Sequence, residues 1–286
     1  MKIHFLLNEQ AHSKPHPTFV SAMGLLADRG FAVTRGIPEA ALLCPDRLCA
    51  RHDLYVLKSR SELALSVAAV LHDRGGQFLN PYPACALAQN RVTAASRLAA
   101  AGVPVPRSWL TADFALLCDL VAEHPLVVKP YRGACCATPL VAYGAEDLVG
   151  LPLRDQPVLV EEYIEGDVAD LRVQVIGEEV FALPKVACGA AAGPLLPVSA
   201  ELRDLALRCG RAFGLSVFGL DVVQRRDAPV VVEFDHAPCF AGIPQAAALL
   251  AVHIENVVGG RTLLTRQPPT LHVSAGWSGC LQGAAA

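Results

Sequence analysis

Three acidic residues late in the chain have a spacing that could hold a metal ion. Asp221 lies in the apolar segment VFGLDVV, and Glu233 and Asp235 lie in VVVEFD, after a turn of sequence RRDAP. If both segments are β-strands, alternation puts Glu233 and Asp235 on one face, and a hairpin brings Asp221 opposite them. Carboxylates crowded on an apolar sheet repel one another, and Mg²⁺ relieves that cost because it takes oxygen ligands and shares them with phosphates. The pattern predicts a metal–nucleotide site; the alternative is a set of solvated acids on a sheet face.

The elements before this hairpin predict a mixed α/β fold. The first hundred residues alternate short apolar strands with amphipathic helices, which is typical of a parallel sheet with helices on its faces. Ser61 is suited to cap the second of these helices, and Gly177 to turn a later antiparallel hairpin. We expect strands at 2–7, 31–36, 53–59 and 77–81, and one continuous alanine-rich helix over 83–102.

The composition excludes several classes of protein. The 286 residues are 53% hydrophobic and 18% charged with a net charge of −3, which is typical of a compact globular protein. This charge gives no basis for binding to nucleic acid or to an anionic membrane, and the apolar runs are too short to span a bilayer. The N-terminus lacks the long apolar core of a secretory signal, so we expect a cytoplasmic protein. Ten cysteines without a C-x-x-C spacing are expected to be free thiols, with Cys135 and Cys136 as the alternative reactive or metal-binding pair.

The acidic segment resembles the metal-binding end of the ATP-grasp superfamily, and of its RimK-type carboxylate–amine ligases in particular. There the motif is G-V-D, a hairpin, and then E-x-N-x-x-P-G; this chain matches it through Pro238, with Asp235 for Asn and Cys239 for Gly. The resemblance extends from the first strand to about residue 260. It implies an ATP-grasp fold of two α+β lobes preceded by a parallel-sheet pre-ATP-grasp domain. The expected parts are the N-terminal domain (1–104), the small lobe (105–165), the C-terminal lobe with the metal site (166–262) and a tail (263–286).

The same resemblance assigns residues to ATP. Lys129, in VVKP, is expected to contact phosphates, and Arg91 stands where the family places a phosphate-binding Lys. Main-chain groups of PVLVEEYIEG are expected to meet the adenine edge, and one acid between Glu161 and Asp167 to accept the ribose hydroxyls. The alternative for each of these side chains is an ordinary solvated position. The proposed nucleotide-binding residues are Arg91, Lys129, Glu161, Glu162, Tyr163, Ile164 and Asp170.

Two further basic residues are expected to act in catalysis. Asp170 to Arg172 (DLR) resembles the D-I-R of RimK-type ligases, and Arg172 could hold the γ-phosphate or a substrate carboxylate with its planar fork. Lys185 would lie near ATP; a surface salt bridge is the alternative for both side chains. Lys58, Ser59 and Arg60 follow the third strand, at the sheet edge where parallel sheets bind ligands, and are candidates for an acidic substrate. Two segments depart from the family: YRGACCATP keeps only Gly133 of several glycines, and 186–199 has few polar side chains.

The resemblance implies an enzyme that uses ATP and Mg²⁺, with Mn²⁺ as an alternative. ATP would phosphorylate a carboxylate, and an amine would displace the phosphate to form an amide, with an amino acid or peptide as one substrate. The carboxylate of Asp235, in place of a neutral Asn, is expected to favour tighter metal binding. Two alternatives stay open: an inositol-phosphate-type kinase, and a nucleotide- or partner-binding protein without turnover. The expected partners are ATP, a small acid and an amine, with a homo-oligomer also open.

Overall fold

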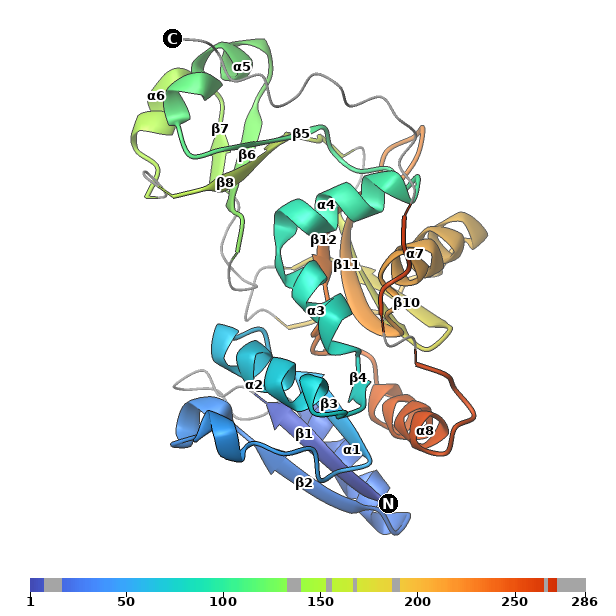
Figure 1. The fold of residues 1–286 in the computed structure, drawn as a ribbon. Coiled ribbons are helices and arrows are strands. Elements are labelled where there is room, and N and C mark those ends of the chain that lie inside the picture. The colour runs from blue at the N-terminus through green and yellow to red at the C-terminus, as the bar shows by residue number, and fades with distance from the viewer. Residues whose placement is uncertain are drawn as a thin grey trace.

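The computed structural model describes residues 1–7, 17–132, 140–152, 156–166, 169–186, 191–264 and 267–271. These residues form three four-stranded sheets (Figure 1). Both the parallel first sheet and the antiparallel sheets that follow confirm the predicted α/β class. Within the described ranges, every helix is too short or too polar to reach across a membrane.

The first sheet is parallel, with strand order β2-β1-β3-β4. The central strand β3 is a continuous buried apolar run, as expected for a strand covered on both faces. The predicted cap of α2 is confirmed, because the Ser61 hydroxyl accepts a 3.0 Å hydrogen bond from Ala64 N. The elements are β1 (Lys2–Leu7), α1 (Pro17–Asp28), β2 (Ala32–Gly36), η1 (Pro38–Ala40), η2 (Pro45–Arg47), β3 (Leu54–Lys58), α2 (Glu62–Asp73) and β4 (Phe78–Leu79).

The single helix predicted over 83–102 is wrong, because the structure has two helices there. They are α3 (Tyr82–Gln89) and α4 (Arg91–Ala100). Asn90 between them is extended (φ −88°, ψ 111°), and its side chain accepts hydrogen bonds from Val92 N and Thr93 N. The alanine-rich composition favours one long helix, but the Asn90 side chain competes for the amides that begin a new one. The break makes Arg91 the first residue of α4.

The second sheet forms a small lobe of its own, with antiparallel strand order β5-β8-β6-β7. Its apolar side chains form a cluster separate from the other two clusters of the described chain. In Figure 1 this lobe stands apart from the rest of the molecule. Its elements are β5 (Ser108–Thr111), η3 (Phe114–Leu117), α5 (Cys118–Glu123), β6 (Leu126–Pro130), β7 (Leu140–Ala142), α6 (Ala145–Val149) and β8 (Val158–Glu162).

The third sheet is antiparallel, with order β10-β9-β11-β12. The predicted hairpin turn at Gly177 is confirmed, and its φ of +64° suits glycine. Helix α8 packs back against the N-terminal sheet, where Leu250 and Ile254 share one core with Ile3 and Phe5. The N-terminal and C-terminal parts therefore pack as one body. The elements are β9 (Leu171–Ile176), β10 (Glu179–Pro184), α7 (Ala200–Phe213), β11 (Val217–Val223), β12 (Val230–Asp235) and α8 (Ala246–Val258).

Candidate functional site

The hairpin β11–β12 places the three predicted metal-binding acids on one face of the third sheet. Asp221 pairs directly with Glu233, and Gly219 pairs with Asp235. Directly paired residues share a face, and Glu233 and Asp235 are two residues apart on one strand. Glu233 and Asp235 share a face as alternation predicts, and a register shift between Asp221 and Val222 brings Asp221 opposite Glu233.

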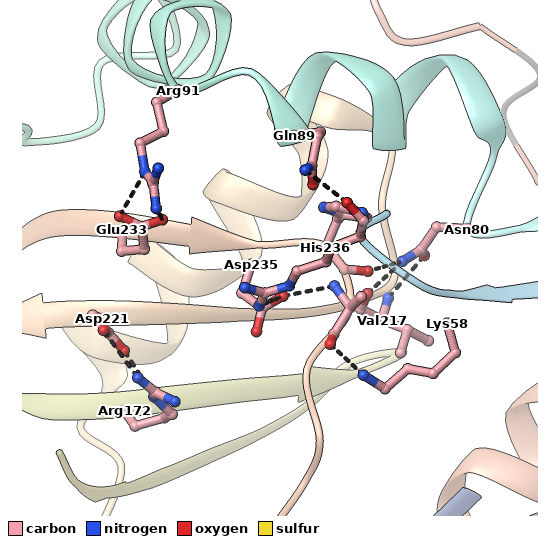
Figure 2. A network of polar contacts seen from close by, with 12 residues as sticks. Lys58, Asn80, Gln89, Arg91, Arg172, Val217, Asp221, Glu233, Asp235 and His236 are labelled. Carbon is pink, nitrogen blue, oxygen red and sulfur yellow. Dashed lines mark hydrogen bonds and ion pairs between the residues drawn. The ribbon is translucent and has the colours of Figure 1, made fainter. Parts of the chain in front are cut away.

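Each of these carboxylates is bound by an arginine from a different part of the chain (Figure 2). Arg172, which faces Asp221 across β9 and β11, donates from Nε to Oδ1 at 2.8 Å and from Nη2 to Oδ2 at 3.0 Å. Arg91, at the start of α4, lies 3.1 Å from Oε1 of Glu233. Arg60, beyond the end of β3, pairs with Asp235. The arginines neutralise charges that would otherwise repel one another on this face.

Two lysines extend this cluster of basic side chains. Nζ of Lys129 lies 2.6 Å from Oε2 of Glu161, 2.7 Å from the carbonyl oxygen of Val232 and 3.7 Å from Glu233. Lys129 therefore joins the small lobe to β12. On the other side, Nζ of Lys185 lies 3.3 Å from Asp221 and 3.8 Å from Asp170.

The structure thus brings most of the predicted site residues together. The basic members are Lys58, Arg60, Arg91, Lys129, Arg172 and Lys185, and the acidic members are Glu161, Asp170, Asp221, Glu233 and Asp235. Six cations against five carboxylates leave an excess of positive charge. Such a surplus suits a polyanionic ligand that arrives with its own counterion.

The donor set suits Mg²⁺, although the acids are turned toward arginines. Among the described residues, no three His, Cys, Asp or Glu side chains are close enough to hold a metal ion. The oxygen donors share one sheet face, and the same face holds Gln174, which pairs with Gly219 on β11. Gln174 is buried, and its Oε1 has no hydrogen-bond partner. A hard cation takes such carboxylate and amide oxygens as ligands, so the residues fit the metal once Arg172 releases Asp221 and Arg91 releases Glu233.

The strand predicted to meet adenine has little free main chain before Ile164. The N–H of Glu162 donates to Arg107 O at 3.0 Å, and that of Tyr163 donates to Pro125 O at 2.9 Å. A main-chain donor to adenine must therefore come from Ile164 or beyond, while the carbonyl groups can still accept. Glu161 is 6% exposed and binds Lys129, so it is poorly placed to meet ribose.

Three side chains, two near the end of β8 and one on β9, are not predicted by the sequence to meet a ligand. The ring of Tyr143, just after β7, lies 6.4 Å from the ring of Tyr163, and both side chains are exposed. No local pattern in the sequence could have paired these two tyrosines. Gln174 was missed, although its spacing of two residues from Arg172 on β9 puts both side chains on the same face.

The basic residues at and just beyond the end of β3 bind residues at and just beyond the end of β12. Nζ of Lys58 donates to Ala237 O at 2.5 Å, and Arg60 pairs with Asp235. Ser59 is buried, and its backbone hydrogen-bonds to His236. These contacts occupy the groups expected to bind an acidic substrate. Replacing the family's neutral Asn with Asp adds a negative charge, and these contacts show that Arg60 and Lys58 offset it.

Burial shifts several pKa values here. Burial lowers the pKa of Lys58 to about 8, although Asp235 opposes the shift. It also lowers the pKa of His236 to about 4, with Arg60 adding to the effect. Burial alone would raise the pKa of Asp235, but Arg60 and Lys58 hold it below its ordinary value. Burial raises the pKa of Glu161, and Lys129 offsets part of that rise.

Arg172 keeps its charge. Burial would lower the pKa of Arg172, but its bonds to Asp221 raise it above the usual value.

Several segments that the sequence singles out are not among the described residues. Residues 133–139 of the glycine-poor loop, with Cys135 and Cys136, lie outside the described residues, as do Asp167 and residues 187–190.

Comparison with known proteins identifies the family. The RimK-like ATP-grasp domain model matches residues 88–255, which is more than half of the chain. A probable alpha-L-glutamate ligase from Pseudomonas fluorescens (strain SBW25) is 28% identical over 215 residues, covering 66% of this chain and 70% of that protein.

Solved structures share the fold. A RimK domain protein ATP-grasp from Sphaerobacter thermophilus DSM 20745 superposes with a TM-score of 0.72 at 18% identity, covering 88% of this chain and 99% of that one. The ATP-grasp ligase PsnB, complexed with minimal precursor, Mg and ADP, gives 0.63 at 21% identity, covering 88% and 96%. The chain therefore belongs to the RimK-like ATP-grasp family.

Proposed function

We propose that this protein is an ATP- and Mg²⁺-dependent ligase that joins a carboxylate to an amine. The observation that carries the proposal is the row of three carboxylates on β11 and β12, each bound by an arginine and flanked by Lys129 and Lys185. The family match supports the same reaction class. The relative's name, alpha-L-glutamate ligase, makes glutamate the first acid or amine to test.

The side chains suggest how the nucleotide is held. Asp221, Glu233 and Asp235 would hold Mg²⁺, or Mn²⁺ as an alternative, which would supply positive charge to offset the negative charge of the phosphates. Arg91 and Arg172, released from these carboxylates, can then bind phosphate oxygens through their planar forks. Lys129 and Lys185 would offset charge that develops as the phosphoryl group moves to the substrate carboxylate.

The protein supplies no covalent nucleophile in this scheme. The substrate carboxylate attacks the terminal phosphorus, ADP leaves, and the amine then displaces inorganic phosphate from the acyl phosphate. Arg172 suits the carboxylate or the γ-phosphate because it already binds Asp221 in a two-point geometry. Adenine would lie beside the 162–164 linker, where Tyr143 and Tyr163 offer exposed rings.

A second candidate is a nucleotide-binding protein without turnover. The segment YRGACCATP favours it, because only Gly133 remains where backbone amides must approach phosphate closely. The two functions differ in products.

Product analysis tests the proposal. The protein is incubated with ATP, Mg²⁺, glutamate and a panel of amines and acids, and ADP and amide products are quantified by mass spectrometry. The ligase produces ADP and amide in equal amounts, and Asp221→Asn abolishes both. Nucleotide binding without ADP formation for any pair would favour the second candidate.

A further inference from the structure

The end of β3 and the end of β12 meet residue by residue, in antiparallel order. Nζ of Lys58 donates to Ala237 O at 2.5 Å, the Ser59 backbone hydrogen-bonds to His236, and Arg60 pairs with Asp235. Residues 58–60 belong to the N-terminal domain, and residues 235–237 carry one of the proposed metal ligands. Three consecutive contacts thus connect the N-terminal sheet to the metal-binding strand.

Both members of the Arg60–Asp235 pair are fixed and poorly hydrated. Each side chain is 17% exposed. The carbonyl of Arg60 accepts a 2.9 Å hydrogen bond from Nε2 of Gln89 on α3, and Oδ1 of Asp235 accepts one of 2.7 Å from Ala237 N. Because water screens this pair weakly, the charge of either side chain acts strongly on its neighbours.

The pair explains how a carboxylate can stand where related ligases have an amide. An Asp in place of Asn adds one negative charge beside Glu233. Arg60 adds one positive charge at the same place, so the pair has the net charge of the neutral Asn.

We propose that Arg60 is a positioning residue of the metal site. It acts through Asp235, orienting its carboxylate and cancelling its extra charge, so that the N-terminal domain sets the metal affinity. This inference rests on the metal–nucleotide site proposed above.

A double-substitution cycle tests the role of Arg60. The variants are Arg60→Met, Asp235→Asn and the combination, and the probe is the non-hydrolysable analogue AMP-PNP, titrated by calorimetry at a series of MgCl₂ concentrations. The reported quantity is the Mg²⁺ concentration that half-saturates nucleotide binding. R60M removes the arginine that pairs with Asp235 and leaves only Lys58 to offset its charge, so it should lower that concentration about tenfold, whereas D235N leaves Arg60 without its carboxylate and should raise it about tenfold. The combination should return to within about threefold of wild type.

The pattern of signs separates this role from a purely structural one. If Arg60 only tethers two domains, R60M and D235N both raise the half-saturating Mg²⁺ concentration, and in the combination it stays as high as in D235N. That result overturns the inference. Arg60→Lys, which keeps the charge, serves as the matched control and should stay within about twofold of wild type. If R60M does not fold, the combination and D235N still decide the question, because the inference predicts a lower half-saturating Mg²⁺ concentration in the combination than in D235N. A wild-type protein without Mg²⁺-dependent AMP-PNP binding overturns the proposed site and this inference together.

Discussion

Asp221 and Glu233 face each other across β11 and β12, yet each carboxylate binds a different arginine, Arg172 from β9 and Arg91 from α4. The pairing of the strands holds the two carboxylates close together, and the arginines neutralise the charges that would otherwise repel. In the proposed site, metal and nucleotide would therefore bind together. The metal needs the carboxylate oxygens, and the arginines need the phosphates as replacement partners.

The first prediction concerns Asp221. Asp221→Asn keeps the shape and an oxygen acceptor for Arg172 but removes the charge that attracts the metal. We expect Mg²⁺-dependent AMP-PNP affinity to fall at least about tenfold. Calorimetry with and without Mg²⁺ measures this, and Asp227→Asn, at an exposed turn acid, is the control. Unchanged affinity in Asp221→Asn would remove this residue from the metal site.

The second prediction concerns the buried pair of Lys129 and Glu161. The sequence alone makes Lys129 either a phosphate-binding or a solvated residue, but the structure shows it 8% exposed, with Glu161 6% exposed beside it. Lys129→Met leaves a buried carboxylate without its partner, so we expect the free energy of unfolding to fall by about 3 kcal/mol.

The control for that pair removes both charges. Lys129→Met combined with Glu161→Gln should recover most of the lost stability, because no unpaired buried charge remains. Nucleotide affinity should stay low in both variants. Urea unfolding of the ligand-free proteins gives the stabilities; equal stability of Lys129→Met and wild type would show that the pair is not structural.

The third prediction concerns the helix break before Arg91. Asn90→Ala removes the acceptor for Val92 N and Thr93 N, which should cost about 1 kcal/mol and loosen the position of Arg91. Asn90→Asp keeps the cap and is the matched control. Urea unfolding should show a lower stability, and AMP-PNP titration a lower affinity, for Asn90→Ala than for Asn90→Asp. Identical behaviour would mean that the cap neither stabilises α4 nor positions Arg91.

The fourth prediction concerns pH. Burial, with a contribution from His52, lowers the pKa of His4 to about 4, and Nδ1 of His4 lies 2.7 Å from the Thr34 hydroxyl. The unfolded chain has a His pKa of about 6.5, so between pH 6.5 and pH 4 it binds more protons than the folded protein. Stability is therefore lost as pH falls through this range, by about 1–2 kcal/mol from His4 after allowance for solvent screening.

His4→Gln tests this assignment. The glutamine can still bond to Thr34 but does not titrate in this range. Urea unfolding at pH 7 and at pH 4.5 should show a smaller loss of stability in the variant than in wild type. The same loss in both proteins would assign the acid sensitivity to other groups, such as His236, whose pKa burial also lowers to about 4.

Much of the fold follows from local patterns. The apolar runs that become β1, β3 and β11, the cap at Ser61 and the turn at Gly177 all depend on neighbouring residues, which a sequence displays directly. The shared face of Glu233 and Asp235 also follows from alternation, but the pairing of Asp221 with Glu233 depends on a β-bulge between Asp221 and Val222 that alternation does not predict. The break at Asn90 was missed, since a run rich in alanine outweighs a single capping residue in any propensity argument.

The partners of the site residues could not be predicted in the same way. Arg60 is separated from Asp235 by most of the chain, and no periodicity relates the two positions. The burial of Lys129 depends on β6 packing beside β8 and on contact with Val232 O, and both are products of tertiary structure. The arginine that binds each acid is decided by tertiary structure: by the pairing of β9 with β11 for Arg172, and by the positions of α4 and of the end of β3 for Arg91 and Arg60.

The most direct test of the account is thermal unfolding of the wild-type protein with ATP, in the presence and absence of Mg²⁺. We expect a Mg²⁺-dependent rise in the unfolding midpoint, since a ligand at about a hundred times its dissociation constant adds roughly 2.7 kcal/mol of stability. Asp221→Asn should lose most of that rise. An unchanged midpoint in ATP and Mg²⁺ at millimolar concentrations would contradict the claim that this site binds a metal–nucleotide complex.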